Sequence, residues 1–231
     1  MKTVLTRLGF AACLPGVAGG ANLGKVVMKL IIVALGALLV AAPVRAQQTR
    51  LPPIPPERYD EAQKKAAAEF EAALKRPPYG PFEKLIYSPD LVTPIRLMGG
   101  YLRRGTAFGP ALSELAILVT ARELSQDYVW RSHAAAALQA GIKQETVDAI
   151  ADGRRPTGMS ADEEICYDFS TELHHNKRVS DATYARMKDR FGERGVVDLT
   201  AVNGYYVMVA MVINATRIQV TDGSKLSRFP D

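Results

Sequence analysis

The feature that most constrains this fold is the run ELAILVTA at residues 114–121, which is apolar on nearly every face of a helix. A helix without a polar face has no side to turn toward water, so neighbouring elements must cover it all round. Ser113 stands where it can cap the first turn, because a serine side chain accepts a hydrogen bond from a free backbone N–H. The run predicts a buried helix over residues 114–124.

The chain after residue 58 carries helical signals almost throughout, with no alternating β pattern and no internal repeat. One helix opens at Ser88 or at Thr93, each followed by a proline suited to a first turn, and runs to Leu102. The residues SADE at 160–163 have the spacing of a capping box. The other expected helices span 59–76, 126–141, 143–151, 160–174, 180–191 (which Gly192 ends) and 196–218. Together they predict a single all-α domain, a helical bundle over residues 59–231.

The first 46 residues have the composition of a targeting segment. Residues 28–47, MKLIIVALGALLVAAPVRAQ, join a lysine, a short apolar core and an A-x-A-like cleavage site, the three parts of a secretory signal. We then expect Met28 to be the natural start of the protein and residues 1–27 to be an over-long gene prediction. We predict cleavage after Ala46 and a periplasmic or secreted product, with an uncleaved anchor as the alternative. The proline-rich residues 47–58 are expected to be an extended lead-in.

Removal of this segment changes the charge balance. Five of the 29 Lys and Arg residues precede position 47 and no Asp or Glu does, so residues 47–231 hold 24 basic and 24 acidic side chains. Such a chain lacks the excess positive charge with which proteins bind nucleic acid or anionic membranes. We therefore expect no nucleic acid as a partner and no stable membrane insertion after cleavage.

The cysteine and histidine content excludes several kinds of site. Cys13 lies in the segment that is removed, which leaves Cys166 without a partner for a disulfide or a two-cysteine redox centre. Of the three histidines, His174 and His175 stand near a helix C-terminus, where a positive side chain interacts favourably with the helix dipole. A metal site needs more ligands at suitable spacing, so we expect none.

Two ionisable residues fall inside the most apolar helices. Glu114 shares a stripe with Ile117, and His133 shares one with Trp130. A buried carboxylate is costly without a partner, and His133 is the nearest candidate if the two helices form an antiparallel hairpin. A structural interpretation of each residue stays open: His133 as a core histidine with a satisfied hydrogen bond, and Glu114 as an exposed first-turn residue.

Residues 113–153, SELAILVTARELSQDYVWRSHAAAALQAGIKQETVDAIADG, resemble the core repeat of the carboxymuconolactone decarboxylase family, which includes the AhpD-like alkylhydroperoxidases. The shared pattern is a Glu that opens an apolar helix, an aromatic pair before a His, Ala-rich packing, a Gly and a short helix. Residues 178–215 resemble the C-terminal half of the single-domain members. The resemblance implies an AhpD-like helical bundle that assembles as a homo-oligomer, a trimer or a hexamer. The long last helix fits burial in such an interface or in the core of one chain equally well.

The peroxidase branch of this family carries a C-x-x-C-x-x-x-H motif. With His133 as its histidine, the two cysteine positions fall on Gln126 and Val129, and the glutamate that relays protons falls on Glu114. The thiolate is the species that attacks the peroxide, so a thiol peroxidase is disfavoured. The retained pair fits the decarboxylase side of the family, which uses no cofactor.

The resemblance therefore predicts a cofactor-independent decarboxylase, a carboxy-lyase acting on a small carboxylated lactone. His133 is assigned as the proton donor to carbon, because histidine as a residue type exchanges protons near neutral pH. Glu114 is the group that orients His133 or relays the proton. The expected substrate-binding residues are Tyr128, Trp130 and Tyr206 on the pocket wall, with Arg96 and Arg122 to hold a carboxylate.

Several alternatives stay open at this point. Arg96 and Arg122 fit surface salt bridges equally well. The same scaffold would serve a lactone or ester hydrolase or an isomerase. Outside enzymology, the alternative is an exported oligomer that binds a small apolar ligand without converting it, with Glu114 and His133 as a buried structural pair.

Overall fold

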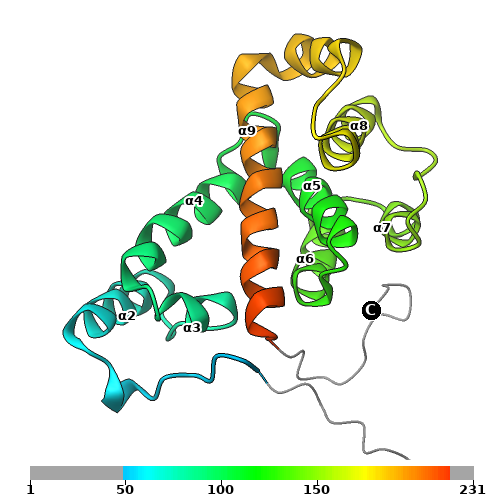
Figure 1. Cartoon of the computed structure of the whole chain (residues 1–231). Coiled ribbons are helices and arrows are strands. Elements are labelled where there is room, and N and C mark those ends of the chain that lie inside the picture. Colours follow the sequence, from blue (N-terminus) through cyan, green and yellow to red (C-terminus); the bar gives the residue numbers. More distant parts are fainter. Residues whose placement is uncertain (1–48, 219–231) are drawn as a thin grey trace, which may run out of the picture. The chain divides into compact units, whose positions relative to one another are not determined.

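The most apolar run of the chain folds as helix α5, Gly109–Glu123, in which every residue from Leu112 to Ala121 is buried. The computed structural model describes residues 49–218. Helices α4, α6, α7, α8 and α9 pack against α5, which gives it the cover that its composition requires (Figure 1). Within the described residues every regular element is helical, which confirms the predicted all-α class.

The expected signal segment, its start at Met28 and its cleavage site lie outside the described residues. The described elements begin with the 3-10 helix η1 (Pro56–Arg58) and end with the longest helix, α9 (Asp181–Thr216). Between them, in chain order, lie α2 (Glu61–Leu74), α3 (Pro81–Leu85), η2 (Pro89–Leu91), α4 (Val92–Arg104), α5, α6 (Asp127–Gln139), α7 (Gln144–Ala151) and α8 (Ala161–Asn176). Of the two predicted openings, Ser88 precedes η2, which runs directly into α4. The opening at Thr93 is wrong, because α4 begins at Val92 and Thr93 lies inside its first turn.

The prediction that Ser113 caps the central helix is wrong. Helix α5 begins four residues earlier, at Gly109, and Pro110 occupies its first turn, where a fixed φ and a missing N–H carry no penalty. The Ser113 hydroxyl instead donates to the Gly109 carbonyl oxygen, 3.1 Å away inside the helix. Glu114 therefore lies in the second turn and faces the interior of the bundle, rather than standing exposed at the helix end.

Other helix ends follow their local sequence signals. Ser160 and Glu163 form the predicted capping box of α8, with each side chain bonded to the backbone N–H of the other residue. Ser180 caps α9 by accepting from the Thr183 N–H. The predicted break at Gly192 is present as a kink inside α9, since this residue has φ 70° and ψ 179°. After the kink, the second part of α9 runs down the middle of the bundle (Figure 1).

Helix α9 is the one helix within residues 49–218 that is long and apolar enough, by length and composition alone, to cross a membrane. Half of its most apolar window is buried inside the structure. Helices at the centre of a packed bundle meet the same criterion, because they too must be apolar on most faces. The composition of α9 is therefore weak evidence for a membrane span.

The buried hydrophobic side chains of the described residues form two clusters. The larger one surrounds α5 and includes side chains from α6, α7, α8 and α9. The smaller one forms under α2, α3 and η2, where Phe70 and Ile86 are fully buried beside Leu85 and Val92. Ile95 of α4 packs against both clusters. This arrangement places α3 beside α9, and residues of both clusters line a cavity.

Candidate functional site

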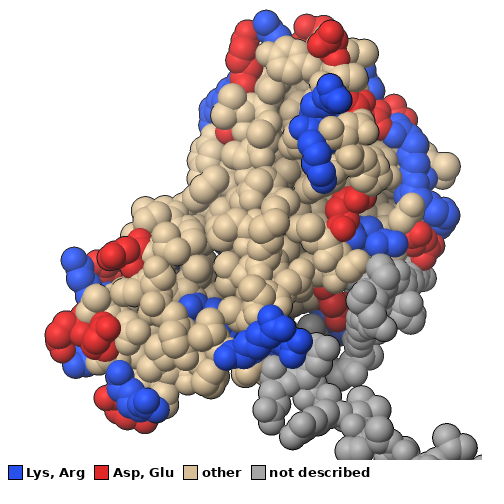
Figure 2. All heavy atoms as spheres, in the orientation of Figure 1, with Lys and Arg blue, Asp and Glu red and all other residues tan. Residues whose placement is uncertain are grey.

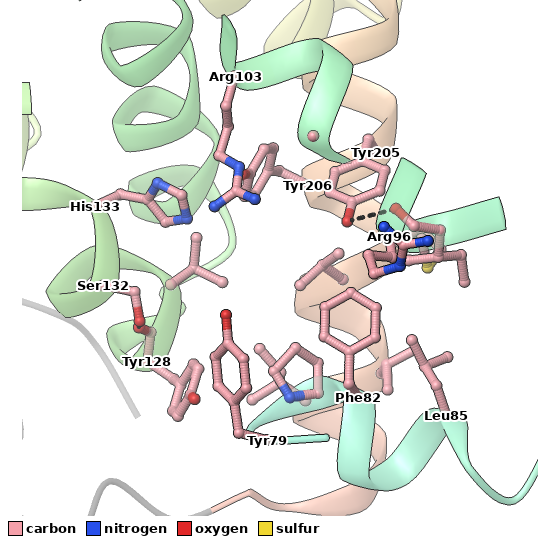
Figure 3. A pocket seen from close by; sticks show the side chains of 18 of the residues that line it. Tyr79, Phe82, Leu85, Arg96, Arg103, Tyr128, Ser132, His133, Tyr205 and Tyr206 are labelled. Atoms are coloured by element: carbon pink, nitrogen blue, oxygen red, sulfur yellow. Dashed lines mark hydrogen bonds between the residues drawn. The ribbon is translucent and has the colours of Figure 1, made fainter. Parts of the chain in front are cut away.

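A cavity of about 630 Å³ lies between α4, α6, α9 and the segment from the end of α2 to α3 (Figure 3). This volume falls within the range of small-molecule sites, roughly 300–1,000 Å³. Apolar side chains form much of the wall. The lining residues with polar or charged side chains are Arg76, Tyr79, Arg96, Arg103, Arg104, Tyr128, Ser132, His133, Tyr205 and Tyr206.

His133 reaches this cavity from α6 with a buried partner behind it. Its Nδ1 lies 2.6 Å from Oε2 of Glu114 on α5, and Glu114 is only 7 % exposed. A carboxylate only accepts hydrogen bonds, so Nδ1 carries the hydrogen and Nε2 is the ring nitrogen left for other partners. The predicted hairpin accounts for the contact, because only residues 124–126 join α5 to α6 and the two helices pack together.

One tyrosine packs against the histidine, and others line the same cavity. The Tyr206 ring packs edge-on against the His133 ring, with 5.0 Å between centroids, and burial raises the Tyr206 pKa far above its ordinary value. Burial also raises the pKa of Tyr205 to about 12, and its hydroxyl donates to the Ile95 carbonyl oxygen. Burial likewise raises the Tyr128 pKa. These phenols are therefore neutral hydrogen-bond donors at physiological pH.

Two glycines make room for these rings. A Cβ on Gly99 of α4 would overlap the Tyr205 hydroxyl. A Cβ on Gly80 would overlap the Tyr128 hydroxyl, and Gly80 also has φ 55°, which favours glycine. The backbone of α4 and of the segment before α3 thus comes close to the tyrosines, which narrows the cavity and limits ring movement.

The charge on the cavity wall is all of one sign. Four arginines line it, and no Asp or Glu is among its lining residues. The Arg103 Nε donates to the Gly99 carbonyl oxygen at 3.0 Å, which orients the guanidinium, and Figure 3 shows this group beside the His133 ring. The Nε of Arg96 is buried without a hydrogen-bond partner. A wall of this kind favours an anionic ligand, because a guanidinium binds a carboxylate through two hydrogen bonds.

Comparison with known proteins identifies the scaffold. Residues 89–164, from η2 to the first turn of α8, match the model of the carboxymuconolactone decarboxylase family. The match covers about a third of the chain and supports the predicted resemblance to this family. The matched segment contains both Glu114 and His133. The comparison with curated proteins found no match.

Two solved structures share the fold of this chain. One is described as an alkylhydroperoxidase AhpD core, an uncharacterized peroxidase-related protein from Ralstonia eutropha JMP134. It is 14 % identical, with a TM-score of 0.59 over 75 % of this chain and 93 % of that one. The other is an uncharacterized peroxidase-related protein from Silicibacter sp. TM1040, 15 % identical, with a TM-score of 0.59 over 80 % and 97 % of the two chains. At these identities the likeness shows the AhpD-like fold alone.

The cavity contains some of the residues expected from the sequence and lacks others. His133, Tyr128, Tyr206 and Arg96 line it, and Glu114 stands directly behind His133. Trp130 and Arg122 do not line it. Substrate binding by Tyr128, Tyr206 and Arg96 therefore remains a prediction. The same prediction is withdrawn for Trp130 and Arg122.

The two exceptions have separate structural reasons. Trp130 is 5 % exposed and packs in the larger hydrophobic cluster. Arg122 lies eight residues beyond Glu114, about 12 Å along the α5 axis at 1.5 Å per residue. Its Nε donates to the Ala151 carbonyl oxygen at the end of α7, so it holds two helix ends together.

Sequence reasoning missed Arg103, Tyr79 and Phe82, which all line the cavity. A signal for Arg103 was present, because Arg96, Gly99 and Arg103 follow one another at helical spacing on one stripe of α4. No comparable signal marked Tyr79 and Phe82, since they belong to a turn and a short helix. Only the packing of α2 and α3 against the rest of the chain brings these rings to the site.

The two positions that carry cysteines in the peroxidase branch of the family have other roles in this chain. The Gln126 side chain accepts from the Tyr128 N–H at the start of α6 and donates to Asn214 on α9. Val129 packs in the core and lines the cavity. The one cysteine of the described residues, Cys166, is fully buried in α8, and burial raises the pKa of its thiol far above the ordinary value. Within residues 49–218 no group of three or more His, Cys, Asp or Glu side chains is arranged to hold a metal ion.

Proposed function

We propose that this protein is a cofactor-independent lyase that releases CO2 from a small carboxylated lactone or a related unsaturated acid. The observation that carries the proposal is the contact between Glu114 and His133, with the histidine on the wall of a cavity lined by arginines. An acid/base group needs both a partner that sets its orientation and access to the substrate. The buried Glu114 carboxylate orients the His133 ring, and the cavity gives the ring access to a substrate.

The reaction uses the cavity in a defined order. The guanidinium groups of Arg103 and Arg96 hold a carboxylate of the substrate. The bond between the reacting carbon and CO2 breaks, and its electron pair moves into the conjugated carbonyl of the lactone. His133 then donates the proton on Nε2 to that carbon, so the substrate has exchanged CO2 for one proton. The neutral phenol of Tyr206 is the candidate to donate a hydrogen bond where negative charge develops, because the Tyr205 hydroxyl already donates to the Ile95 carbonyl oxygen.

Glu114 acts through His133 rather than on the substrate. Its carboxylate accepts from Nδ1 and stabilises the charged imidazolium from which the proton leaves. It also holds the ring in one orientation. In this role Glu114 is a positioning residue, and His133 is the residue that meets the substrate.

The thiol peroxidase alternative lacks its nucleophile in the described residues. Gln126 and Val129 stand in the two cysteine positions, and neither side chain forms a thiolate. Cys166 is not among the residues that line the cavity, and its buried thiol stays protonated at neutral pH.

The proposal includes a homo-oligomer and export. Figure 2 shows charged side chains gathered toward the edges of the molecule and few charges over α9 and the adjoining part of α4. Leu97 and Met98 of α4 and Val197 and Met211 of α9 are exposed in the single chain. An uncovered apolar surface of this kind is typical of subunit interfaces. Export rests on the signal-like composition of residues 28–47.

The test measures CO2 release from a panel of carboxylated lactones with the wild-type chain and with His133→Asn. We expect the variant to lose turnover while its helical circular dichroism and its mass in solution stay unchanged. Opening of the lactone ring without release of CO2 would show that the protein is a hydrolase and that the proposed lyase activity is wrong. Loss of folding or of assembly in the variant would make His133 a structural residue and overturn the assignment.

A further inference from the structure

The cavity wall opposite His133 comes from residues that precede the segment shared with the family. Tyr79, Phe82 and Leu85 line the cavity, whereas the match to the family begins at residue 89. In Figure 3 these three side chains lie along one side of the open space, and His133 and Arg103 lie along the other. His133 and Arg103 therefore face a wall of aromatic and aliphatic side chains, and Arg76 and Arg96 add positive charge at the edge of that wall.

The aromatic wall is held rigidly from behind. Phe70 of α2 is fully buried, and its ring lies 4.8 Å from the Phe82 ring and 5.9 Å from the Tyr79 ring, between centroids. The Arg76 guanidinium covers the Tyr79 ring at 3.5 Å from its centroid. A wall that is ordered before the ligand binds loses little entropy on binding. These side chains are thus suited to recognition and do more than close the hydrophobic core.

The volume of the cavity exceeds what a single small ring needs. A cavity of about 150 Å³ is large enough to bind benzene, and this one has about 630 Å³. A monocyclic lactone seated at His133 would leave the space beside Phe82 and Leu85 to water. Water in that space would form few hydrogen bonds, because the nearest side chains are apolar. A ligand that fills the space therefore binds more tightly.

We propose that the site takes a carboxylic acid of two-ring size with an aryl group. Its charged, reacting end lies at His133 and Arg103, and its aromatic ring packs against Tyr79 and Phe82. The proposal deepens the lyase function and rests on it for the position of the reacting end. Flat rings are favoured over an alkyl chain, because aromatic side chains gain additional energy from edge-on and offset contacts with another ring.

Binding to the full-length chain tests the proposal by isothermal titration calorimetry at constant ionic strength. The probes are 2-naphthoate, the alkyl acid decanoate and the monocyclic lactone acid 5-oxotetrahydrofuran-2-carboxylate. We expect 2-naphthoate to bind with a Kd about tenfold lower than that of the lactone acid, because its second ring buries more apolar surface. Phe82→Ala should raise the Kd for 2-naphthoate about five- to tenfold and leave that for the lactone acid unchanged. Tyr184→Ala is the matched control, since this tyrosine is exposed on α9 and does not line the cavity.

Three outcomes would overturn the proposal: equal Kd values for the two cyclic acids, tighter binding of decanoate than of 2-naphthoate, or a Phe82→Ala effect of the same size on every probe. The lyase function fails on a different measurement. If 2-naphthoate binds as expected and no carboxylated substrate releases CO2, the reaction is wrong and the ligand class stands. If only monocyclic lactone acids release CO2, the reaction stands and the ligand class is wrong.

Discussion

Replacing Glu114 by glutamine tests whether the buried contact to His133 serves the reaction. Glutamine has nearly the same shape and keeps an oxygen that accepts from the His133 Nδ1, but it removes the negative charge. The side chains of His133 and Glu114 are 12 % and 9 % exposed, so water replaces little of the lost interaction. A hydrogen bond to a charged group is worth roughly 1.5–3 kcal/mol. If that stabilisation applies to the charged imidazolium, kcat should fall by about 10- to 150-fold.

The assay follows CO2 release under saturating substrate, together with urea unfolding of the same variant. We expect KM to change little, because Glu114 does not line the cavity. The free energy of unfolding should change by less than about 1 kcal/mol, since the hydrogen bond is kept in neutral form. A kcat within threefold of wild type, combined with a large loss of stability, would show that the pair is a structural strut and refute the reasoning.

Four further predictions follow from other parts of the structure. Arg103→Gln should raise KM about tenfold or more through loss of a charged hydrogen bond, whereas Arg122→Gln, outside the cavity, should leave KM unchanged. Gly80→Ala should lower the free energy of unfolding by roughly 1–3 kcal/mol, measured in urea, because of its positive φ and the overlap with a tyrosine. The Cys166 thiol should react with a thiol reagent at pH 8 only after unfolding, because burial raises its pKa. Burial alone would raise the Asp168 pKa, but hydrogen bonds from two arginines lower it, so stability should fall as the pH drops below about 4 and Asp168→Asn should weaken that dependence.

The pairing of Glu114 with His133 was predictable from the sequence because it depends on short-range features. An all-apolar helix must be buried, a carboxylate within it needs a partner, and a short connection to the next helix brings that partner near. The break at Gly192 and the capping box at residues 160–163 were predictable for the same reason. In each case the residues that interact are close along the chain.

The wrong and missing assignments share a different cause. The sequence placed the start of the central helix at Ser113, because a serine before an apolar run is a common cap, whereas Pro110 starts it one turn earlier. Arg122 lies on the same helix as Glu114 but two turns further along, where its side chain contacts the end of α7 instead of the cavity. Whether an arginine reaches a cavity depends on its height along the helix as well as on the face it occupies.

The sequence by itself determined the helical class, the contact between the buried Glu114 and His133, and the replacement of both cysteines of the peroxidase motif. Periodicity, caps and motif spacing act over a few residues and are legible in one chain. The tertiary structure alone decided what faces His133. Tyr79 and Phe82 precede His133 by about fifty residues and Tyr206 follows it by about seventy. Their meeting in one cavity depends on how α2, α3, α4 and α9 pack, and packing depends on the shapes of all these surfaces at once.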